Sequence, residues 1–163
     1  MKLKKRIPLN ALVNYKTLEH FDCGEKQLNK FLKEFARINE TQHISKTFLF
    51  CEDEKLIGYF TLCSSSIEVD LLPQETSISL PKYNVPTILL ARFAVAKEYQ
   101  GQGYGKEMMK EVIRLVNRVS EYIGVYGITV DTKEKAKDFY IKYGFNVLNS
   151  NCLLLHSKQY LIE

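Results

Sequence analysis

A cluster of glycines at the end of an apolar run is the feature that most limits how this chain can fold. The sequence QGQGYG at residues 100–105 follows the apolar run 89–95 and precedes a stretch whose apolar residues recur with helical spacing. The cluster is therefore predicted to lie where a strand turns into a helix. Glycine permits backbone conformations that are closed to other residues and leaves room for a ligand against the main chain. Because N–H groups at a helix start attract anions, this turn is typical of a diphosphate site.

The spacing of the glycines excludes two common nucleotide-binding loops. A Walker A loop needs a glycine where Gln100 stands and a serine or threonine where Glu107 stands. A dinucleotide-binding GxGxxG loop needs a third glycine, and the two possible frames have Lys106 and Met108 there instead. The remaining pattern is QxxGxG on a strand-to-helix turn.

Periodicity and turn residues elsewhere predict a single mixed α/β domain that covers residues 1–163. The segment 64–86 contains a serine run and three prolines, so we expect it to be irregular and to face the substrate. The expected elements are a helix over 28–36, a hairpin of strands 47–51 and 55–62, a central strand over 87–95, a helix after the glycines, a strand at 128–130, a helix over 133–143 ended by Gly144, and strands at 145–148 and 153–161.

Composition narrows the class of protein without identifying a ligand. The chain has a net charge of +4 and is 45% hydrophobic, as ordinary soluble globular proteins are. No apolar run approaches the roughly 20 residues that cross a bilayer, and polar residues and Pro8 follow the basic start where a signal peptide would be apolar. The four cysteines are scattered without metal-ligand spacing, so we expect buried free thiols and no metal site. We expect a cytoplasmic protein.

Three motifs, in order along the chain, resemble the GNAT superfamily of N-acetyltransferases. The acetyl-CoA loop of that family reads Arg or Gln, two residues, Gly, one residue, then Gly or Ala, which residues 100–105 match. Residues 90–95 (LARFAV) resemble its central strand, and residues 136–145 (AKDFYIKYGF) resemble its late A…FY…GF motif. The resemblance implies a GNAT fold, with a central mixed sheet that splays between two parallel strands and has flanking helices.

The resemblance also implies roles for the matching positions, with acetyl-CoA as cosubstrate. Tyr140 would donate a proton to the departing CoA thiolate. The backbone of Phe93, Ala94 and Val95 would bind the pantetheine arm as an added strand and polarise the acetyl carbonyl. The residues that would hold the pyrophosphate are Gln100, Gly101, Gln102, Gly103, Tyr104, Gly105 and Lys106.

The N-terminal part narrows the resemblance to one branch of the superfamily. Residues 21–32 are similar to the FxCGxxxLNxFL opening of a GNAT branch found as toxins in bacterial toxin–antitoxin pairs. That branch acetylates the α-amino group of aminoacyl-tRNA, is silenced by a ribbon-helix-helix antitoxin, and is expected to form a homodimer. Its central strand usually reads LGRLAV, so Ala91 and Phe93 depart from the pattern where the strand meets its substrate.

The central strand carries Arg92 where many GNAT enzymes place a carboxylate that deprotonates a lysine-like amine. A fixed cation repels an ammonium group, and α-amines with a pKa near ~8 need less deprotonation than lysines near ~10.4. We therefore predict that Arg92 binds a substrate whose α-amine is attached to an anionic carrier, as in charged tRNA. Glu52 or Glu68 could still supply a base. Further phosphate contacts are expected from Lys2, Lys4, Lys5 and Arg6.

Each interpretation has an alternative. Arg92 could instead pair with Glu68 or Asp131, Tyr140 could be a half-buried packing residue, and the basic residues 2–6 could form a solvated arm. For the chain as a whole, one alternative is a GNAT enzyme that acetylates a small-molecule or protein amine. The other is a module that binds CoA or an antitoxin without turnover.

Overall fold

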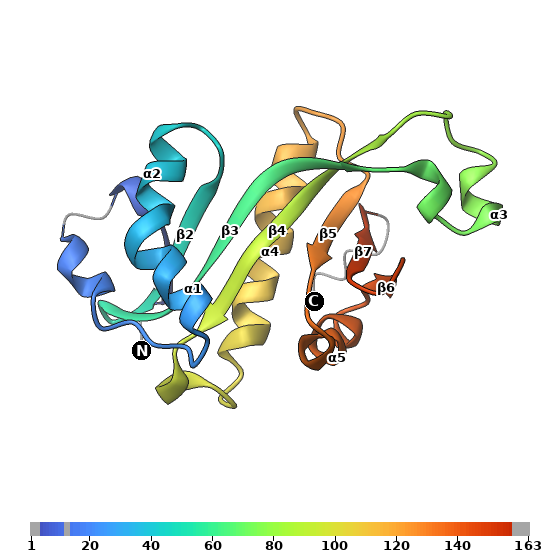
Figure 1. Ribbon diagram of the computed structural model, residues 1–163. Helices are drawn as coiled ribbons and strands as arrows, with labels where there is room; N and C mark the ends of the chain where they lie inside the picture. The colour runs from blue at the N-terminus through green and yellow to red at the C-terminus, as the bar shows by residue number, and fades with distance from the viewer. Residues whose placement is uncertain (1–3, 12–13, 158–163) are drawn as a thin grey trace. The chain divides into compact units, whose positions relative to one another are not determined.

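The computed structural model of the protein describes residues 4–11 and 14–157 (Figure 1). Its strands pair in the order β1-β2-β3-β4-β5-β7-β6, and β4 and β5 are parallel. The strands are β1 (Lys4–Pro8), β2 (Lys46–Glu52), β3 (Lys55–Ile67), β4 (Val85–Val95), β5 (Gly127–Asp131), β6 (Asn146–Val147) and β7 (Cys152–His156). The α-helices are α1 (Lys26–Lys30), α2 (Ala36–Thr41), α3 (Gln74–Ser77), α4 (Tyr104–Ser120) and α5 (Lys137–Lys142).

The chain forms two compact units, each built from two separate segments. The first unit contains residues 1–63 and 91–112, and the second contains residues 64–90 and 113–163. Strands β3 and β4 and helix α4 each run from one unit into the other. The single domain expected from the sequence stays a prediction. No helix in the described part of the chain is long and apolar enough to cross a membrane.

The hairpin of the first unit forms where the sequence predicts it. Strands β2 and β3 are antiparallel, with Glu52 opposite Lys55. The two residues between them, Asp53 and Glu54, have φ of 47° and 67°, the positive values that short hairpin turns require. Strand β3 is longer than expected, because residues 63–67 continue it to Ile67.

Residues 4–8 form a strand, so the described part of the basic segment 2–6 is not the free arm that was one alternative. Strand β1 pairs with β2, and Arg6 lies opposite Phe50. The Nε atom of Arg6 is 3.4 Å from a carboxylate oxygen of Glu111 on α4. The sequence does not predict this strand, because Ile7 is its one aliphatic side chain and the segment shows no alternation of apolar and polar residues. Lys2, for which phosphate contacts were expected, lies outside the described residues.

The expected N-terminal helix contains a π-helical turn, η3 (Phe31–Phe35), between α1 and α2. A π-turn inserts a residue relative to an α-helix and so rotates the side chains of the next turn about the helix axis. Phe31 and Leu32 are therefore buried as the apolar stripe predicts, whereas Phe35 is 44% exposed. The ring of Phe31 stacks on Tyr59 of β3, with 6.4 Å between their centroids.

The first unit packs helices on both faces of strand β3. Consecutive strand residues point to opposite faces. Tyr59 contacts the N-terminal helical segment, and its hydroxyl donates to the Leu28 carbonyl at 2.7 Å. Gly58 faces the other side, where a Cβ would lie 2.7 Å from the sulfur of Met108 on α4. Met108 is fully buried, as the apolar spacing of this helix predicts.

The second unit holds Tyr140 on a short helix with a well-defined end. Helix α5 follows a 3₁₀ turn, η6 (Glu134–Ala136), within the expected range 133–143. Gly144 has φ of +94°, its N–H donates to the Ile141 carbonyl, and the N–H of Phe145 donates to the Tyr140 carbonyl. These bonds form a Schellman motif, so Gly144 ends the helix as predicted.

The remaining predicted strands are present but short. Strand β7 pairs with both β5 and β6, and it begins close to the expected position 153. Residues 158–161, the rest of that expected strand, lie outside the described part of the chain. The expected irregular segment 64–86 is regular at its two ends, which belong to β3 and β4, and between these strands it contains the short helical turns η4 (Val69–Leu71) and α3. A small core of Ile67, Leu72, Val85 and Leu154 packs there.

We predict that Gly58→Ala destabilises the protein by about 1–3 kcal/mol, the usual cost of overpacking. The new methyl group would collide with the carbonyl oxygen of Ala94 and press on Met108. Urea denaturation measures the loss. Gly124→Ala is the matched control, because a Cβ there meets no atom within 4 Å, and it should change the unfolding free energy by less than about 0.5 kcal/mol. Equal unfolding midpoints for the two variants would contradict this packing.

Candidate active site

The glycine loop of the first unit leaves open space beside its main chain. It connects the turn η5 (Lys97–Tyr99), which follows β4, to the first residue of α4. Gly101 and Gly103 have φ of +73° and +88°, values that disfavour any other residue. A Cβ on either glycine would meet no atom within 4 Å. Since α4 is a long helix whose first amides face this loop, the loop fits an anionic group such as a diphosphate.

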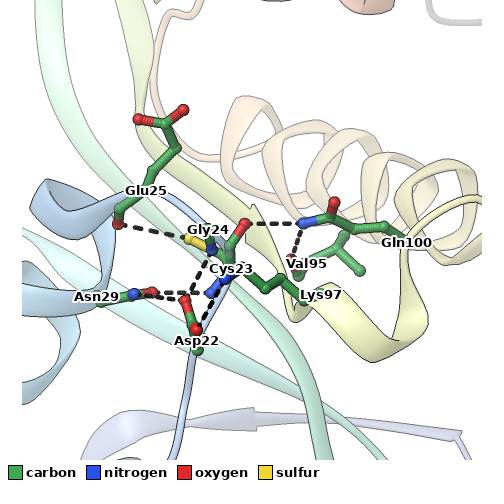
Figure 2. Close-up of polar contacts among 8 residues, drawn as sticks. All are labelled: Asp22, Cys23, Gly24, Glu25, Asn29, Val95, Lys97 and Gln100. Carbon is green, nitrogen blue, oxygen red and sulfur yellow. Dashed lines mark hydrogen bonds and ion pairs between the residues drawn. The ribbon is translucent and has the colours of Figure 1, made fainter.

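The side chain of Gln100 binds the protein's own backbone (Figure 2). Its Nε2 atom donates to the carbonyl of Cys23 at 2.9 Å and to the carbonyl of Val95 at 2.8 Å. The backbone N–H of Gln100 donates to the Lys97 carbonyl at 3.3 Å. All three N–H groups of Gln100 are thereby used, which leaves it none to donate to a ligand. The side chain of Gln102 also binds the protein backbone, since its Nε2 donates to the carbonyl of Glu98 at 2.7 Å.

The other end of the loop is held by Tyr104. Its hydroxyl donates to a carboxylate oxygen of Glu52, the last residue of β2, at 2.6 Å. This hydrogen bond raises the pKa of Tyr104 to about 12. Glu52, one of the two candidate bases, is buried and takes part in anchoring the loop. The other candidate, Glu68, is exposed, as is Lys106 on the first turn of α4.

Strand β4 supplies the backbone that was expected to bind a pantetheine arm. Its ladder with β5 ends at Leu89, whereas β4 itself runs on to Val95. Ala94 is buried, and Phe93 and Val95 are half-buried. The carbonyl of Val95 already accepts the hydrogen bond from Gln100, so it is less open to a ligand than the sequence suggests.

Arg92 carries a charge that no described carboxylate neutralises. Its guanidinium lies 4.6 Å from the centroid of the Phe31 ring, a cation–π contact. One of its nitrogens donates to the carbonyl of Ala91 at 2.7 Å. Within residues 4–11 and 14–157, no ion pair joins Arg92 to Glu68 or Asp131, so that alternative is wrong.

Tyr140, in the second unit, is more deeply buried than the half-buried position that was the alternative. It is 7% exposed, and its ring packs edge-on against Phe139 and Phe145 at centroid distances of 5.2 and 5.5 Å. Burial raises the pKa of the Tyr140 phenol well above its ordinary value. The phenol is therefore protonated at neutral pH and able to donate a hydrogen bond.

One group of residues at the loop escapes prediction from the sequence. Asp22, Asn29 and Lys97 form a polar network with the turn at residues 21–24, which lies against the residues that precede the glycine loop. Of these three residues the FxCGxxxLN pattern specifies only Asn29, and it is the one signal in the sequence. The pattern does not reveal that the turn at residues 21–24 contacts residues 97–100, because these two segments are far apart along the chain.

Comparison with known proteins agrees with this geometry. The model of the GNAT acetyltransferase domain matches residues 44–147. A tRNA-acetylating toxin of Mycobacterium tuberculosis is 30% identical over 128 residues, which cover 78% of this chain and 76% of that protein.

Solved structures extend the similarity over almost the whole chain. The structure of AtaT complexed with acetyl-methionyl-tRNAfMet has a TM-score of 0.87 at 30% identity and covers 96% of each chain. A structure of an AtaT mutant toxin bound to the C-terminus of the antitoxin AtaR and to acetyl-CoA has a TM-score of 0.79 at 28% identity. That match covers 95% of this chain and 94% of the other. The fold expected from the motifs is confirmed.

We predict that Gly103→Ala weakens acetyl-CoA binding at least about tenfold, or about 1.4 kcal/mol. Its φ of +88° is strained for alanine, and the new methyl group would occupy the open space beside the loop. Calorimetric titration measures the affinity. Gly144→Ala introduces a similar strain at φ of +94°, at the end of α5 in the second unit. It should lower the melting temperature and leave the affinity unchanged; equal affinity losses in both variants would count against the loop as the binding site.

Proposed function

The chain belongs to the GNAT acetyltransferase family and transfers an acetyl group from acetyl-CoA to an amine, and from this premise we propose that the amine is the α-amino group of aminoacyl-tRNA. The relatives named as a tRNA-acetylating toxin and as a toxin bound to acetylated tRNA support this substrate. The FxCGxxxLNxFL motif at residues 21–32 supports the same branch.

The proposal rests mainly on Arg92, whose positive charge is not neutralised by any carboxylate among the described residues. A half-buried guanidinium held over Phe31 without a described carboxylate disfavours an ammonium substrate, since like charges repel in a site of low dielectric. An α-amine esterified to tRNA is partly neutral at physiological pH and is linked to phosphates, which attract a cation. Arg92 therefore favours charged tRNA over a free lysine side chain.

The reaction requires one proton donor from the protein. The neutral amine attacks the acetyl carbonyl, the C–S bond breaks, the thiolate takes up the proton of the Tyr140 hydroxyl, and the amide nitrogen releases a proton to water, from which the phenol is restored. The backbone of residues 93–95 binds the pantetheine arm and polarises the carbonyl. Tyr140 donates its hydroxyl hydrogen bond to the departing sulfur, and its burial keeps the phenol in the donor form.

The same proposal extends to partners and location. A ribbon-helix-helix antitoxin silences the enzyme, in keeping with the antitoxin-bound relative. The enzyme acts as a homodimer in the cytoplasm, where charged tRNA is found, and two subunits together offer an extended surface to one tRNA. Light scattering of the purified protein measures the oligomeric state.

We predict that the protein incubated with labelled acetyl-CoA and bulk charged tRNA transfers label to the aminoacyl group. Identifying the acetylated amino acid by mass spectrometry gives the specificity. Label that appears instead on polyamines or on a lysine peptide supports the small-molecule or protein-amine alternative. Binding of acetyl-CoA without any transfer supports the non-catalytic module.

The variant Arg92→Met tests, in the same assay, whether the positive charge of Arg92 binds tRNA. Methionine keeps the apolar contact with Phe31 and removes the charge. The KM for charged tRNA should rise, and the slope of log KM against log salt should fall by about 0.7–0.9 for one lost phosphate contact. An unchanged slope would show that Arg92 meets no phosphate.

We predict that Tyr140→Phe lowers kcat by roughly 10²–10⁴-fold, the usual contribution of a positioned proton donor, and leaves acetyl-CoA affinity unchanged. The phenylalanine ring keeps its contacts with Phe139 and Phe145, so folding should be preserved. Tyr143→Phe is the matched control, since it removes a hydroxyl from a half-buried tyrosine at the end of the same helix. Similar kcat values for the two variants would exclude the catalytic role.

A further inference from the structure

The turn at residues 21–24 is closed by its own side chains (Figure 2). The Oδ1 atom of Asp22 accepts hydrogen bonds from the backbone N–H of Gly24 and from the Nδ2 of Asn29, both at 2.8 Å. Asn29 in turn accepts from the backbone N–H of Cys23 at 2.9 Å. With Gly24 at φ of +92°, the turn has a single well-defined shape that α1 helps to hold, because Asn29 belongs to that helix.

Three contacts join this turn to the residues that lead into the glycine loop. The backbone N–H of Lys97 donates to the carbonyl of Asp22 at 2.8 Å, and the Lys97 ammonium lies 3.2 Å from the Asp22 carboxylate. Gln100 supplies the third contact, because the nitrogen that donates to Val95 also donates to Cys23. We refer to Asp22, Cys23, Asn29, Lys97 and Gln100 as the turn latch.

The bonds of Gln100 depend on the chemistry of an amide. One planar nitrogen satisfies two carbonyl oxygens, and this needs two N–H groups on the same atom. A glutamate of the same length has no N–H and would bring a negative charge against two carbonyl oxygens. Arginine, the other residue that the QxxGxG pattern allows at this position, has several N–H groups in a plane and can replace them.

We propose that Gln100 is a positioning residue, which holds the glycine loop in the conformation that binds diphosphate by fastening the turn at residues 21–24 to the end of β4. The proposal rests on the loop being the acetyl-CoA site and adds how that site is kept in shape. Gln100 has no N–H group left to donate to the ligand, since all of them are used within the protein. It is one residue from Gly101, so a shift of its backbone passes directly to the loop.

The ion pair within the latch is expected to contribute little to global stability. Asp22 and Lys97 are exposed, with side-chain exposures of 52% and 61%, and exposed ion pairs contribute little to unfolding free energies. Hydrogen bonds from Gly24 first, then from Asn29 and Lys97, lower the pKa of Asp22 to about 2. The Asp22 carboxylate is therefore charged at neutral pH, as its hydrogen bonds and its ion pair with Lys97 require.

The test compares Gln100→Glu with Gln100→Arg by calorimetric titration of the purified full-length chain with acetyl-CoA. We expect Gln100→Glu to weaken binding roughly 5- to 100-fold, the range that two net hydrogen bonds give. Gln100→Arg should stay within about threefold of wild type. Gln27→Glu is the control for the added charge, since Gln27 is exposed on α1 and outside the latch, and it should bind as wild type does.

Kinetics and hydrogen exchange separate positioning from a general loss of structure. In Gln100→Glu the KM for acetyl-CoA should rise while kcat and the KM for the acceptor stay unchanged, and the amides of residues 101–106 should exchange faster without ligand. If this variant does not fold, Gln100→Ala replaces it, because alanine removes both donors without adding charge. Wild-type affinity in the glutamate and alanine variants, or equal losses in the glutamate and arginine variants, would overturn the proposal.

The two proposals fail in different ways. If the wild-type protein binds acetyl-CoA but does not acetylate charged tRNA, the tRNA substrate is wrong, and the comparison of Gln100 variants still decides the role of the latch. If charged tRNA is acetylated and the glutamate variant binds acetyl-CoA normally, the positioning role is wrong and the substrate stands.

Discussion

The turn from β4 into α4 is the constraint on which the site depends. The chain must leave a strand, enter a helix and present backbone amides to a ligand, and the positive φ of Gly101 and Gly103 makes this path possible. Such a loop is not rigid by itself, since glycine has the greatest freedom to lose. The structure restrains it from both ends, through Gln100 at its start and Tyr104 at its finish. Because the loop is preorganised, less ordering has to accompany ligand binding.

Burial of the Arg92 guanidinium costs hydration free energy, and contacts with neighbouring groups offset part of this cost. A half-buried guanidinium loses hydration, and the described residues provide no carboxylate to replace it. The face of Phe31 and the carbonyl of Ala91 are the partners that the structure does provide. Phe31 begins the π-helical turn, so the irregularity in the helix and the arginine on the strand belong to one local arrangement. A cation kept under these conditions is available to an anionic substrate.

The sequence predicts best the features that depend on neighbours in the chain. The β2–β3 hairpin, the glycine turn, helix α4 and the end of α5 at Gly144 all follow from local patterns, and all are present. Strand β1 was missed because its one aliphatic residue gives no alternation. The apolar stripe of the expected helix 28–36 was wrong at Phe35, because the π-turn η3 changes the helical phase. The partners of Gln100 and Glu52 depend on tertiary contacts, which no spacing reveals. The catalytic role of Tyr140 and the ligand contacts of residues 93–106 stay predictions.

The latch gives a physical reason why two separate motifs belong together. In FxCGxxxLN, the glycine adopts a positive φ, the asparagine binds the backbone of the cysteine, and the carbonyl of that cysteine is free to accept. In QxxGxG, the glutamine supplies the donor for that carbonyl, although Cys23 and Gln100 are 77 positions apart. A change in the N-terminal turn would thus alter the acceptor that the second motif needs. The two motifs meet through one amide nitrogen, and under the proposed positioning role a change at either motif would alter the shape of the loop.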